Sequence, residues 1–178
     1  MDYTSVYTSP MGNIRLFSDG RSLTGLHTEF WCKRQNKEFS VFENGDELDV
    51  IKQTKRWLEI YFAGKKPDFV PLLAPAGSPF RQMVWNILLS IPYGKVMTYG
   101  EIAKLMALRL NKEKMSAQAV GGAVGANPIG IIIPCHRVIG TNGNLTGYAG
   151  GLCAKRALLE LEGIDTSKLI MPKSSRFL

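Results

Sequence analysis

Two short runs with β-like character lie near the start of the chain. Residues 13–18 and 22–28 flank Asp19-Gly20, a dipeptide that suits the positive backbone angles of a tight hairpin turn. The polar stretch from residue 33 to 45 has no periodic apolar pattern, which predicts a loop or irregular structure.

A helix and a linker are predicted next. Apolar side chains at helical spacing (Val50, Trp57, Leu58 and Tyr61) predict a helix over residues 46–63, with Gly64 positioned to end it. The stretch from Lys65 to Gly77 is rich in proline and is the clearest linker signal of the chain. We therefore expect two domains, residues 1–77 and residues 78–178.

Three residues of the second half can cap helices: Ser78, Thr98 and Ser116. Pro79 follows Ser78 at the favoured first helical position, and Glu101 completes a capping box with Thr98. The second and third of these helices, joined by a polar connection, resemble a helix-turn-helix. That topology alone is weak support, because packed helix pairs are common.

The third of these helices, residues 117–125, has almost no side chains. Gly121, Gly122 and Gly125 each cost a helix interior about 1 kcal/mol relative to alanine, so this composition sacrifices stability. Close approach of another backbone would explain it. The approaching group is either a neighbouring element of the same chain or the groove of a nucleic acid.

Charge is distributed unevenly over the 178 residues. The chain carries a net charge of +7, yet acidic and basic residues balance up to Gly77, so the whole excess lies from Ser78 onward. A basic half suggests a polyanionic partner such as nucleic acid. The alternative is a solvated basic face that keeps the protein soluble.

Other features indicate a soluble globular protein. The composition, 45% hydrophobic and 21% charged, supports a packed core and excludes disordered and collagen-like classes. No apolar run reaches the roughly 20 residues of a membrane span, and the first residues lack the layout of a secretory signal. Three widely spaced cysteines, Cys32, Cys135 and Cys153, do not suggest a disulfide framework. We expect a cytoplasmic protein.

A cysteine next to a histidine is the main chemical signal. Residues 129–133 are predicted to form a buried strand that ends in Pro134-Cys135-His136. A thiolate favoured by a nearby imidazole is a strong nucleophile. Adjacent side chains of an extended chain point to opposite faces, however, so Cys135 and His136 need not touch. For an isolated Cys-His pair, an inert buried cysteine is the more common outcome.

The surrounding motifs change this assessment. Asn127-Pro128, Pro134-Cys135-His136-Arg137-Val138-Ile139-Gly140, Gly147-Tyr148-Ala149-Gly150-Gly151 and residues 158–163 (Leu-Leu-Glu-Leu-Glu-Gly) together resemble the O6-alkylguanine-DNA alkyltransferases. These proteins are also called methylated-DNA–protein-cysteine methyltransferases. The match covers residues 80–163, and the first half matches more loosely. The resemblance implies an α/β ribonuclease H-like N-terminal domain and a mainly helical, DNA-binding and alkyl-accepting C-terminal domain with a helix-turn-helix.

The resemblance also implies a single-turnover transfer reaction. Cys135 would attack the alkyl carbon on guanine O6 and keep the group as a thioether, which has no easy leaving group. His136 would act as the base through a water, with Glu162 orienting His136. Tyr99 would donate a proton toward guanine N3. Glu162 considered alone would be a surface charge.

Duplex DNA containing O6-alkylguanine is the implied partner, with O4-alkylthymine as a further possible substrate. Because O6 faces the interior of the duplex, the nucleotide must be rotated out of the stack. The implied pocket residues are Asn127, Val138, Tyr148, Ala149 and Gly150. The implied minor-groove residues are Ala117, Gln118, Ala119, Gly121, Gly122 and Gly125.

Three departures from the family pattern accompany these expectations. Gln118 stands where an intercalating arginine is usual, residues 108–114 lengthen a connection, and Gly130 replaces a proline or serine. Two alternative functions stay open: a lesion-binding module without transfer, and a cysteine hydrolase. The presence of Cys135 argues against the first, and a hydrolase would turn over.

No cofactor and no metal are expected. His27 and Cys32 are too few to hold a structural zinc ion, which normally has four ligands. Cys153 is expected to be a small packing residue. We expect a monomer that does not associate with membranes.

Overall fold

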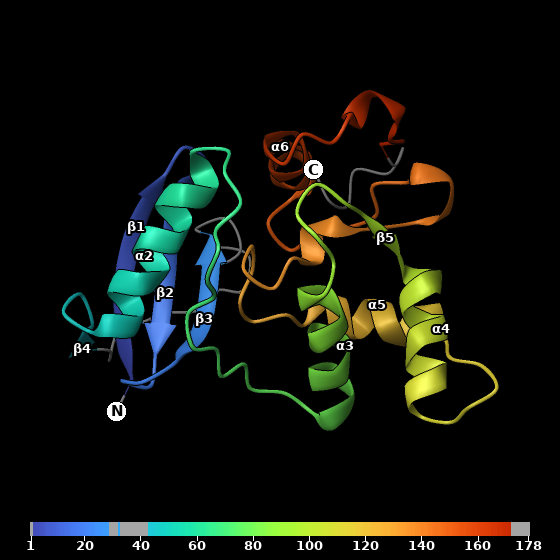
Figure 1. Ribbon diagram of the computed structural model, residues 1–178, viewed down its shortest axis with the longest axis horizontal. Helices are drawn as coiled ribbons and strands as arrows, with labels where there is room; N and C mark the ends of the chain where they lie inside the picture. The colour runs from blue at the N-terminus through green and yellow to red at the C-terminus, as the bar shows by residue number, and fades with distance from the viewer. Residues whose placement is uncertain (1, 29–31, 33–42, 172–178) are drawn as a thin grey trace. The chain divides into compact units, whose positions relative to one another are not determined.

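The computed structural model describes residues 2–28, 32 and 43–171. Its chain divides into two compact units, Met1–Ala76 with Pro128–Gly130 and Gly77–Asn127 with Ile131–Leu178 (Figure 1). None of the helices in the described ranges combines the length and the apolar character that crossing a lipid bilayer requires.

The first unit contains a four-stranded sheet with the strand order β3-β2-β1-β4. Its strands are β1 (Tyr3–Ser9), β2 (Gly12–Ser18), β3 (Leu23–Thr28) and β4 (Glu43–Asn44). The first three are antiparallel neighbours, whereas β4 runs parallel to β1. The β2–β3 hairpin closes at the predicted dipeptide, where Gly20 has a φ of +98° and the Asp19 carboxylate accepts hydrogen bonds from the two N–H groups that follow Gly20.

Two strands of this sheet were not predicted. In β1 the buried positions include Ser5 and Ser9. Because these buried side chains are polar, the strand lacks the alternation of apolar and polar residues that would have predicted it. The predicted loop over residues 33–45 lies outside the described residues up to position 42. Its last part is wrong, because Glu43 and Asn44 pair with β1.

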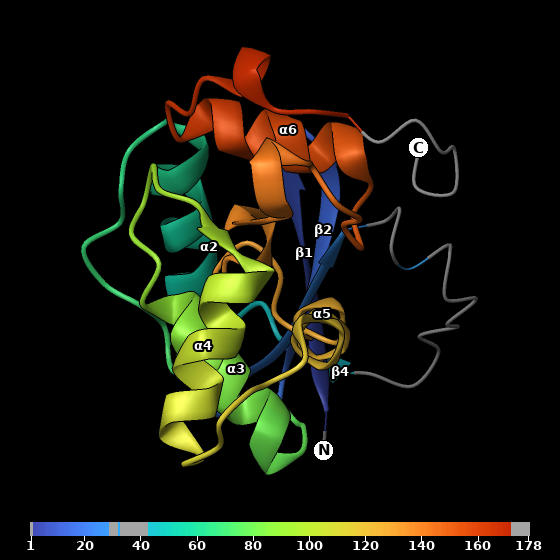
Figure 2. The same ribbon diagram turned by 90° about the vertical axis from the view of Figure 1, so that its right-hand side faces the viewer.

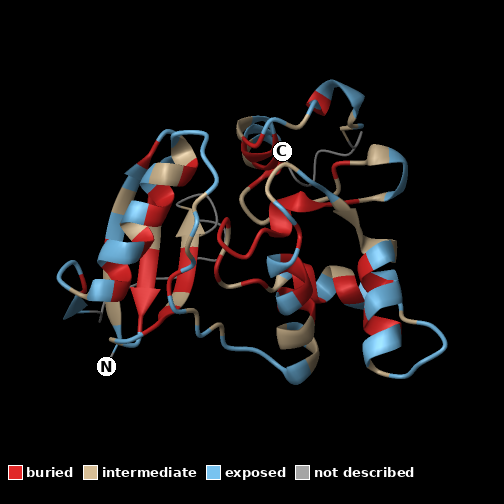
Figure 3. Ribbon diagram, in the orientation of Figure 1, coloured by how far each residue is buried: buried red, intermediate tan, exposed pale blue. Residues whose placement is uncertain are grey.

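Helix α2 (Asp49–Phe62) lies along the sheet and buries its apolar face against it (Figures 1 and 3). Trp57, Leu58 and Tyr61 are among the buried residues, as the helical spacing predicts. The helix begins three residues later than predicted. Asp46 lies in a turn, and its carboxylate accepts hydrogen bonds from Ser5 and from Lys55.

The second unit is mainly helical. Its helices are α3 (Pro79–Leu89), α4 (Tyr99–Arg109), α5 (Ala117–Gly125) and α6 (Leu152–Leu161). All three predicted caps are confirmed: Ser78, Thr98 and Ser116 each accept hydrogen bonds from N–H groups of the first turn that follows. The Thr98 and Glu101 side chains form both halves of a capping box.

Helices α3, α4 and α5 pack together, with α4 and α5 as the helix-turn-helix pair (Figure 2). The buried indole of Trp85 on α3 fixes α5, since its Nε1 donates to the carbonyl of Ala123 at 2.9 Å. The fold class is therefore as predicted, a mixed α/β unit and a mainly helical unit.

A short parallel pair of strands positions the chemistry of the second unit. Strand β5 (Met97–Thr98) pairs with β6 (Val138–Ile139). Tyr99 follows β5 directly, and the 3₁₀ turn Cys135–Arg137 precedes β6 directly. The pairing therefore places the start of α4 next to the segment that carries the cysteine.

The predicted buried strand over residues 129–133 is wrong in conformation, although its isoleucines are buried. Only Ile129 forms a β-bridge, with Leu26 in the first unit, and the residues after it form turns. Ile131 has a φ of +67°, a left-handed conformation that a β-branched residue rarely adopts and that is incompatible with a strand. Burial by itself does not distinguish a strand from a compact turn.

Candidate active site

Cys135 lies in the 3₁₀ turn Cys135–Arg137 and not at the end of an extended strand. The alternation of faces that would separate Cys135 from His136 in a strand therefore does not apply. The turn is closed by backbone hydrogen bonds from Cys135 N to Ile133 O at 2.8 Å and from Arg137 N to Pro134 O at 3.0 Å. All three residues of the turn are buried.

The side-chain amide of Asn127 contacts the cysteine turn. Its Nδ2 donates to the carbonyl of Ile133 at 2.8 Å and to Sγ of Cys135 at 3.1 Å. Burial raises the pKa of the Cys135 thiol, and this hydrogen bond together with the positive charge of Lys155 opposes the rise without cancelling it. The amide thus supports negative charge on a sulfur whose surroundings disfavour it.

His136 and Glu162 form a fully buried pair. Nε2 of His136 lies 2.7 Å from Oε1 of Glu162, which caps the C-terminus of α6. Burial lowers the pKa of His136, and its contact with Glu162 partly offsets this effect. Because Nε2 is engaged by the carboxylate, the buried Nδ1 is the ring nitrogen on which a proton can be received.

Sequence reasoning assigned no role to Arg137, yet Arg137 completes this buried cluster. Its Nε and Nη2 donate to the two carboxylate oxygens of Glu162 at 2.8 and 3.1 Å, and its Nη1 donates to Ile91 O at 2.6 Å. Burial alone raises the pKa of Glu162, but His136 and Arg137 outweigh it and lower the pKa to about 2. Glu162 is therefore a buried carboxylate that stays ionised at neutral pH.

Gly94 gives Glu162 a further hydrogen-bond donor. Its N–H donates to Oε2 at 3.0 Å, and its φ of +73° is one that favours glycine. A Cβ at this position would also lie 3.0 Å from the carbonyl oxygen of Glu162. The hydroxyl of the neighbouring Tyr93 donates a hydrogen bond to Leu161 O at 3.1 Å. Tyr93 and Gly94 therefore both hold the end of α6.

Lys155 is a second residue that sequence reasoning missed. It lies on α6 with 1% of its surface exposed, and its Nζ donates to the carbonyls of Val138 at 2.6 Å and Thr146 at 3.0 Å. Burial lowers the pKa of Lys155 to about 8. The signal for both missed residues is the same: basic side chains at buried positions require partners, but the sequence does not show that the positions are buried.

Burial raises the pKa of the Tyr99 and Tyr148 phenols, and a negative charge on Cys135 adds to the rise. Burial is the larger cause in each case. Thr146 donates a hydrogen bond from its hydroxyl to the Tyr99 hydroxyl at 3.2 Å.

The other predicted pocket residues occupy the segments before and after the turn. Val138 is fully buried in β6, whereas Ala149 and Gly150 are partly exposed in the segment that precedes α6. A Cβ on Gly150 would lie 2.7 Å from Cε1 of Tyr148, so only glycine fits beside that ring in this arrangement.

Helix α5 presents a bare face. Gln118, Gly122 and Gly125 are exposed and follow one another at helical spacing, and added Cβ atoms on the two glycines would meet nothing within 4 Å. Ala117 and Ala119 are also exposed. Gly121 differs, because its Cβ would lie 3.7 Å from the ring of Tyr99. The bare helix thus adjoins the predicted proton donor.

Two family models match the chain over most of its length. The model of the ribonuclease-like domain of 6-O-methylguanine DNA methyltransferase matches residues 3–73, and the model of the DNA binding domain of that protein matches residues 79–164. The chain belongs to this family.

Named relatives of the methyltransferase family agree with this assignment. Methylated-DNA–protein-cysteine methyltransferases from Haemophilus influenzae and Methanosarcina acetivorans are each 45% identical, over 91% and 90% of this chain and 87% and 98% of their own lengths. The structure of Mycobacterium tuberculosis O6-methylguanine methyltransferase matches with a TM-score of 0.75 and 40% identity over 98% of this chain and 97% of its own. A structure of the Mycobacterium tuberculosis protein in complex with DNA matches with a TM-score of 0.76 and 39% identity, covering 94% of each chain.

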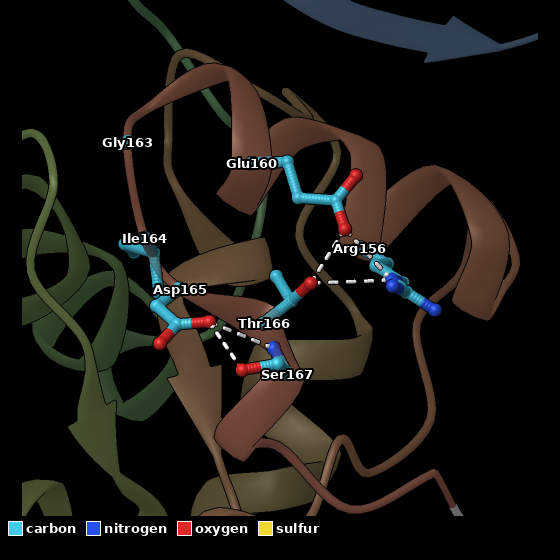
Figure 4. A pocket seen from close by; sticks show the side chains of 7 residues that line it. All are labelled: Arg156, Glu160, Gly163, Ile164, Asp165, Thr166 and Ser167. Atoms are coloured by element: carbon cyan, nitrogen blue, oxygen red, sulfur yellow. Dashed lines mark hydrogen bonds and ion pairs between the residues drawn. The ribbon is translucent and has the colours of Figure 1, made fainter.

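Two features of this methyltransferase fold lie outside the cysteine cluster. Cys153 is exposed, so its prediction as a packing residue is wrong. A shallow hollow of about 460 Å³ lies at the end of α6 and beside the 3₁₀ turn Thr166–Lys168 (Figure 4). Arg156, Glu160 and Thr166 line it and hydrogen-bond to one another, and none of them is a predicted site residue.

Among the described residues, no three His, Cys, Asp or Glu side chains gather as a metal site would require.

Proposed function

We propose that this protein repairs DNA by direct reversal, moving an alkyl group from O6-alkylguanine in duplex DNA onto Cys135. One observation carries the assignment of the acceptor. Within the described residues of a chain from this family, Cys135 is the cysteine that is buried, hydrogen-bonded by Asn127 and followed by a histidine–carboxylate pair. Cys153 is exposed, and its thiol has no such surroundings.

Activation of the thiol falls to His136. Because burial raises the pKa of Cys135, the thiol is protonated at neutral pH and needs a base. Because burial also lowers the pKa of His136, its imidazole is neutral and able to accept a proton. We infer that the proton passes from Sγ to His136 through a water, and that the ionised Glu162 stabilises the imidazolium that results.

The transfer step makes one bond and breaks another. The Cys135 thiolate attacks the alkyl carbon, the S–C bond forms, and the electron pair of the C–O6 bond moves into the guanine ring. Tyr99 gives its phenolic proton to N3 of the departing base, so that the base leaves neutral and Tyr99 becomes a phenolate. The thioether retains the alkyl group, which makes the reaction irreversible and limits each molecule to one turnover.

Access to O6 requires the damaged nucleotide to leave the duplex, since O6 of a paired guanine faces inward. The exposed, nearly bare face of α5 (Ala117, Gln118, Ala119, Gly122 and Gly125) fits close approach to a minor groove, and Gly121 packs beside Tyr99. Gln118 would fill the space that the extruded base leaves. Asn127, Val138, Tyr148, Ala149 and Gly150 would form the walls of the pocket.

The same proposal assigns roles to the two parts of the chain. Residues 78–178 would bind DNA and accept the alkyl group, and they carry the whole net charge of +7. Lysine and arginine contacts to phosphates are independent of sequence and weaken with salt, which suits a protein that scans DNA. Residues 1–77 would form the ribonuclease H-like domain. We further infer a cytoplasmic, monomeric protein.

The deciding experiment is a mass measurement after incubation with a duplex that contains O6-methylguanine. Trypsin releases residues 115–137 as a fragment that contains Cys135 and lacks Cys153. We expect this fragment to gain one methyl group per protein molecule. Cys135→Ser should abolish transfer, and the matched control Cys153→Ser should retain it. An unmodified fragment from a protein that binds the lesion tightly would favour the lesion-binding module, and repeated turnover would favour a hydrolase.

A further inference from the structure

The hydroxyl of Tyr99 is an acceptor in the structure. Tyr99 is the first residue of α4, and Thr146 lies 47 positions later in the segment before α6. Thr146 Oγ1 donates to Tyr99 Oη at 3.2 Å. Because the threonine proton occupies one lone pair of the phenolic oxygen, the proton of Tyr99 itself is left to point toward another acceptor.

Thr146 is held in place by its own backbone. Its carbonyl accepts a hydrogen bond from the buried Nζ of Lys155 at 3.0 Å, and the same Nζ donates to Val138 O at 2.6 Å. Its N–H donates to Asn144 O at 2.9 Å. The threonine therefore belongs to a segment that a buried cation ties to β6, the strand that directly follows the Cys135 turn.

This contact acts on the energy of the phenolate. Burial raises the pKa of Tyr99, and a charge on Cys135 raises it further, while the hydrogen bond from Thr146 lowers it. A phenol in these surroundings resists giving up its proton. A donor aimed at its oxygen is stronger when that oxygen is charged than when it is neutral, so the contact strengthens as the proton leaves.

We propose that Thr146 is a positioning residue for Tyr99. Its hydroxyl orients the phenol and stabilises the phenolate that forms when Tyr99 protonates the departing guanine. This inference rests on the proposed function. In the step concerned, the Tyr99 proton moves to N3 of the base, the electron pair of the O–H bond stays on the phenolic oxygen, and Thr146 donates its hydrogen bond to that oxygen without losing its own proton.

The test compares Thr146→Val, which keeps the shape and removes the hydroxyl, with Thr146→Ser, which keeps the hydroxyl. We expect the valine variant to transfer the methyl group from an O6-methylguanine duplex about 10-fold more slowly in a single turnover, which corresponds to about 1.4 kcal/mol, because the charged phenolate loses a hydrogen-bond donor. The serine variant should stay within about 3-fold of the natural protein, as a conservative replacement that retains the hydrogen bond. Thr141→Val, at an exposed threonine of the same segment, is the matched control.

A second substrate separates positioning from a structural role. In 3-deaza-O6-methylguanine a C–H group replaces N3, so Tyr99 has no acceptor for its proton. The natural protein and Thr146→Val should then react at equal rates, and in a Tyr99→Phe background the valine substitution should have no further effect. An equal slowing on both substrates would overturn the proposal, as would an unchanged rate on both.

The outcome for Thr146 is distinguishable from failure of the proposed function. If fragment 115–137 from the natural protein carries no methyl group after incubation with the duplex, the proposed function fails before any variant is compared. If the natural protein is methylated and the valine variant matches it, only the role of Thr146 fails. Thermal unfolding of each variant checks that the rates refer to folded protein.

Discussion

Arg137 and Glu162 lie 25 positions apart in the sequence and are joined by two hydrogen bonds in a buried part of the second unit. The carboxylate that Arg137 binds also holds Nε2 of His136. The arginine thereby keeps Glu162 ionised, and the ionised Glu162 fixes the imidazole. The orientation of the proposed base thus depends on a residue that is itself part of the cysteine turn.

Arg137→Met should destabilise the protein strongly. Removing one partner of a buried ion pair leaves the other charge buried and uncompensated, at a cost of about 3–5 kcal/mol. Urea unfolding measures this loss. The control is Arg156→Met, whose solvent-exposed ion pair with Glu160 should contribute much less to stability. Equal losses of unfolding free energy in the two variants would show that the buried ion pair contributes no more to stability than the exposed one.

The free energy of unfolding should decrease as the pH is lowered, and Glu162 should be one of the groups responsible. The pKa of Glu162 is lowered from 4.5 to about 2, so its ionised form stabilises the folded state above pH 4.5, and this stabilisation is lost as the pH falls toward 2. The unfolding free energy of the natural protein should therefore decrease more steeply below pH 4.5 than that of Glu162→Gln. The exposed Glu160→Gln serves for comparison. Parallel curves for Glu162→Gln and the natural protein would contradict the assignment.

Cys135 and Cys153 should differ in which reagent modifies them first. Iodoacetamide needs an accessible thiolate, so the exposed Cys153 should be labelled before Cys135, which is buried and has a raised pKa. An O6-methylguanine duplex should modify only Cys135. Peptide mass spectrometry over a time course follows both reactions. Faster iodoacetamide labelling of Cys135 would mean that its thiol is exposed and activated without a substrate.

Gly122→Ala should raise stability and weaken DNA binding at the same time. A Cβ at this exposed position of α5 meets nothing within 4 Å, and alanine favours a helix over glycine by about 1 kcal/mol. The added methyl group would, however, stand on the face proposed to enter the minor groove. Thermal unfolding and duplex titration report the two effects separately. A stabilised variant with unchanged affinity would remove Gly122 from the interface.

Gln118→Arg should bind duplex DNA more tightly and leave the chemistry unchanged. The side chain is exposed in the first turn of α5, so a positive charge added there would still be attracted to the DNA phosphates from the space that the extruded base leaves. The logarithm of affinity against the logarithm of salt concentration should steepen by about 0.9 for that one added charge. The reaction with free O6-benzylguanine, which needs no duplex, provides the control. Equal affinity of both proteins would place Gln118 outside the groove.

Local signals accounted for much of the second unit. A capping side chain acts on N–H groups two or three residues away, so Ser78, Thr98 and Ser116 indicated where helices begin from the sequence alone. The motif around Cys135 indicated the family. The strand predicted over residues 129–133 was wrong because an apolar run indicates burial, while the backbone angles depend on how the turn packs.

The sequence by itself determined where α3, α4 and α5 begin and which half is basic, because both depend on residue type and short spacing, and its family motifs indicated the proposed acceptor. The tertiary structure decided that Glu162 is buried and ionised beside Arg137, that Lys155 is buried and bonded to the carbonyls of Val138 and Thr146, and that Thr146 contacts Tyr99. The reason is physical. A buried charge or hydroxyl must have a partner, and in this fold the partners come from positions many residues away, which only the packed chain brings together.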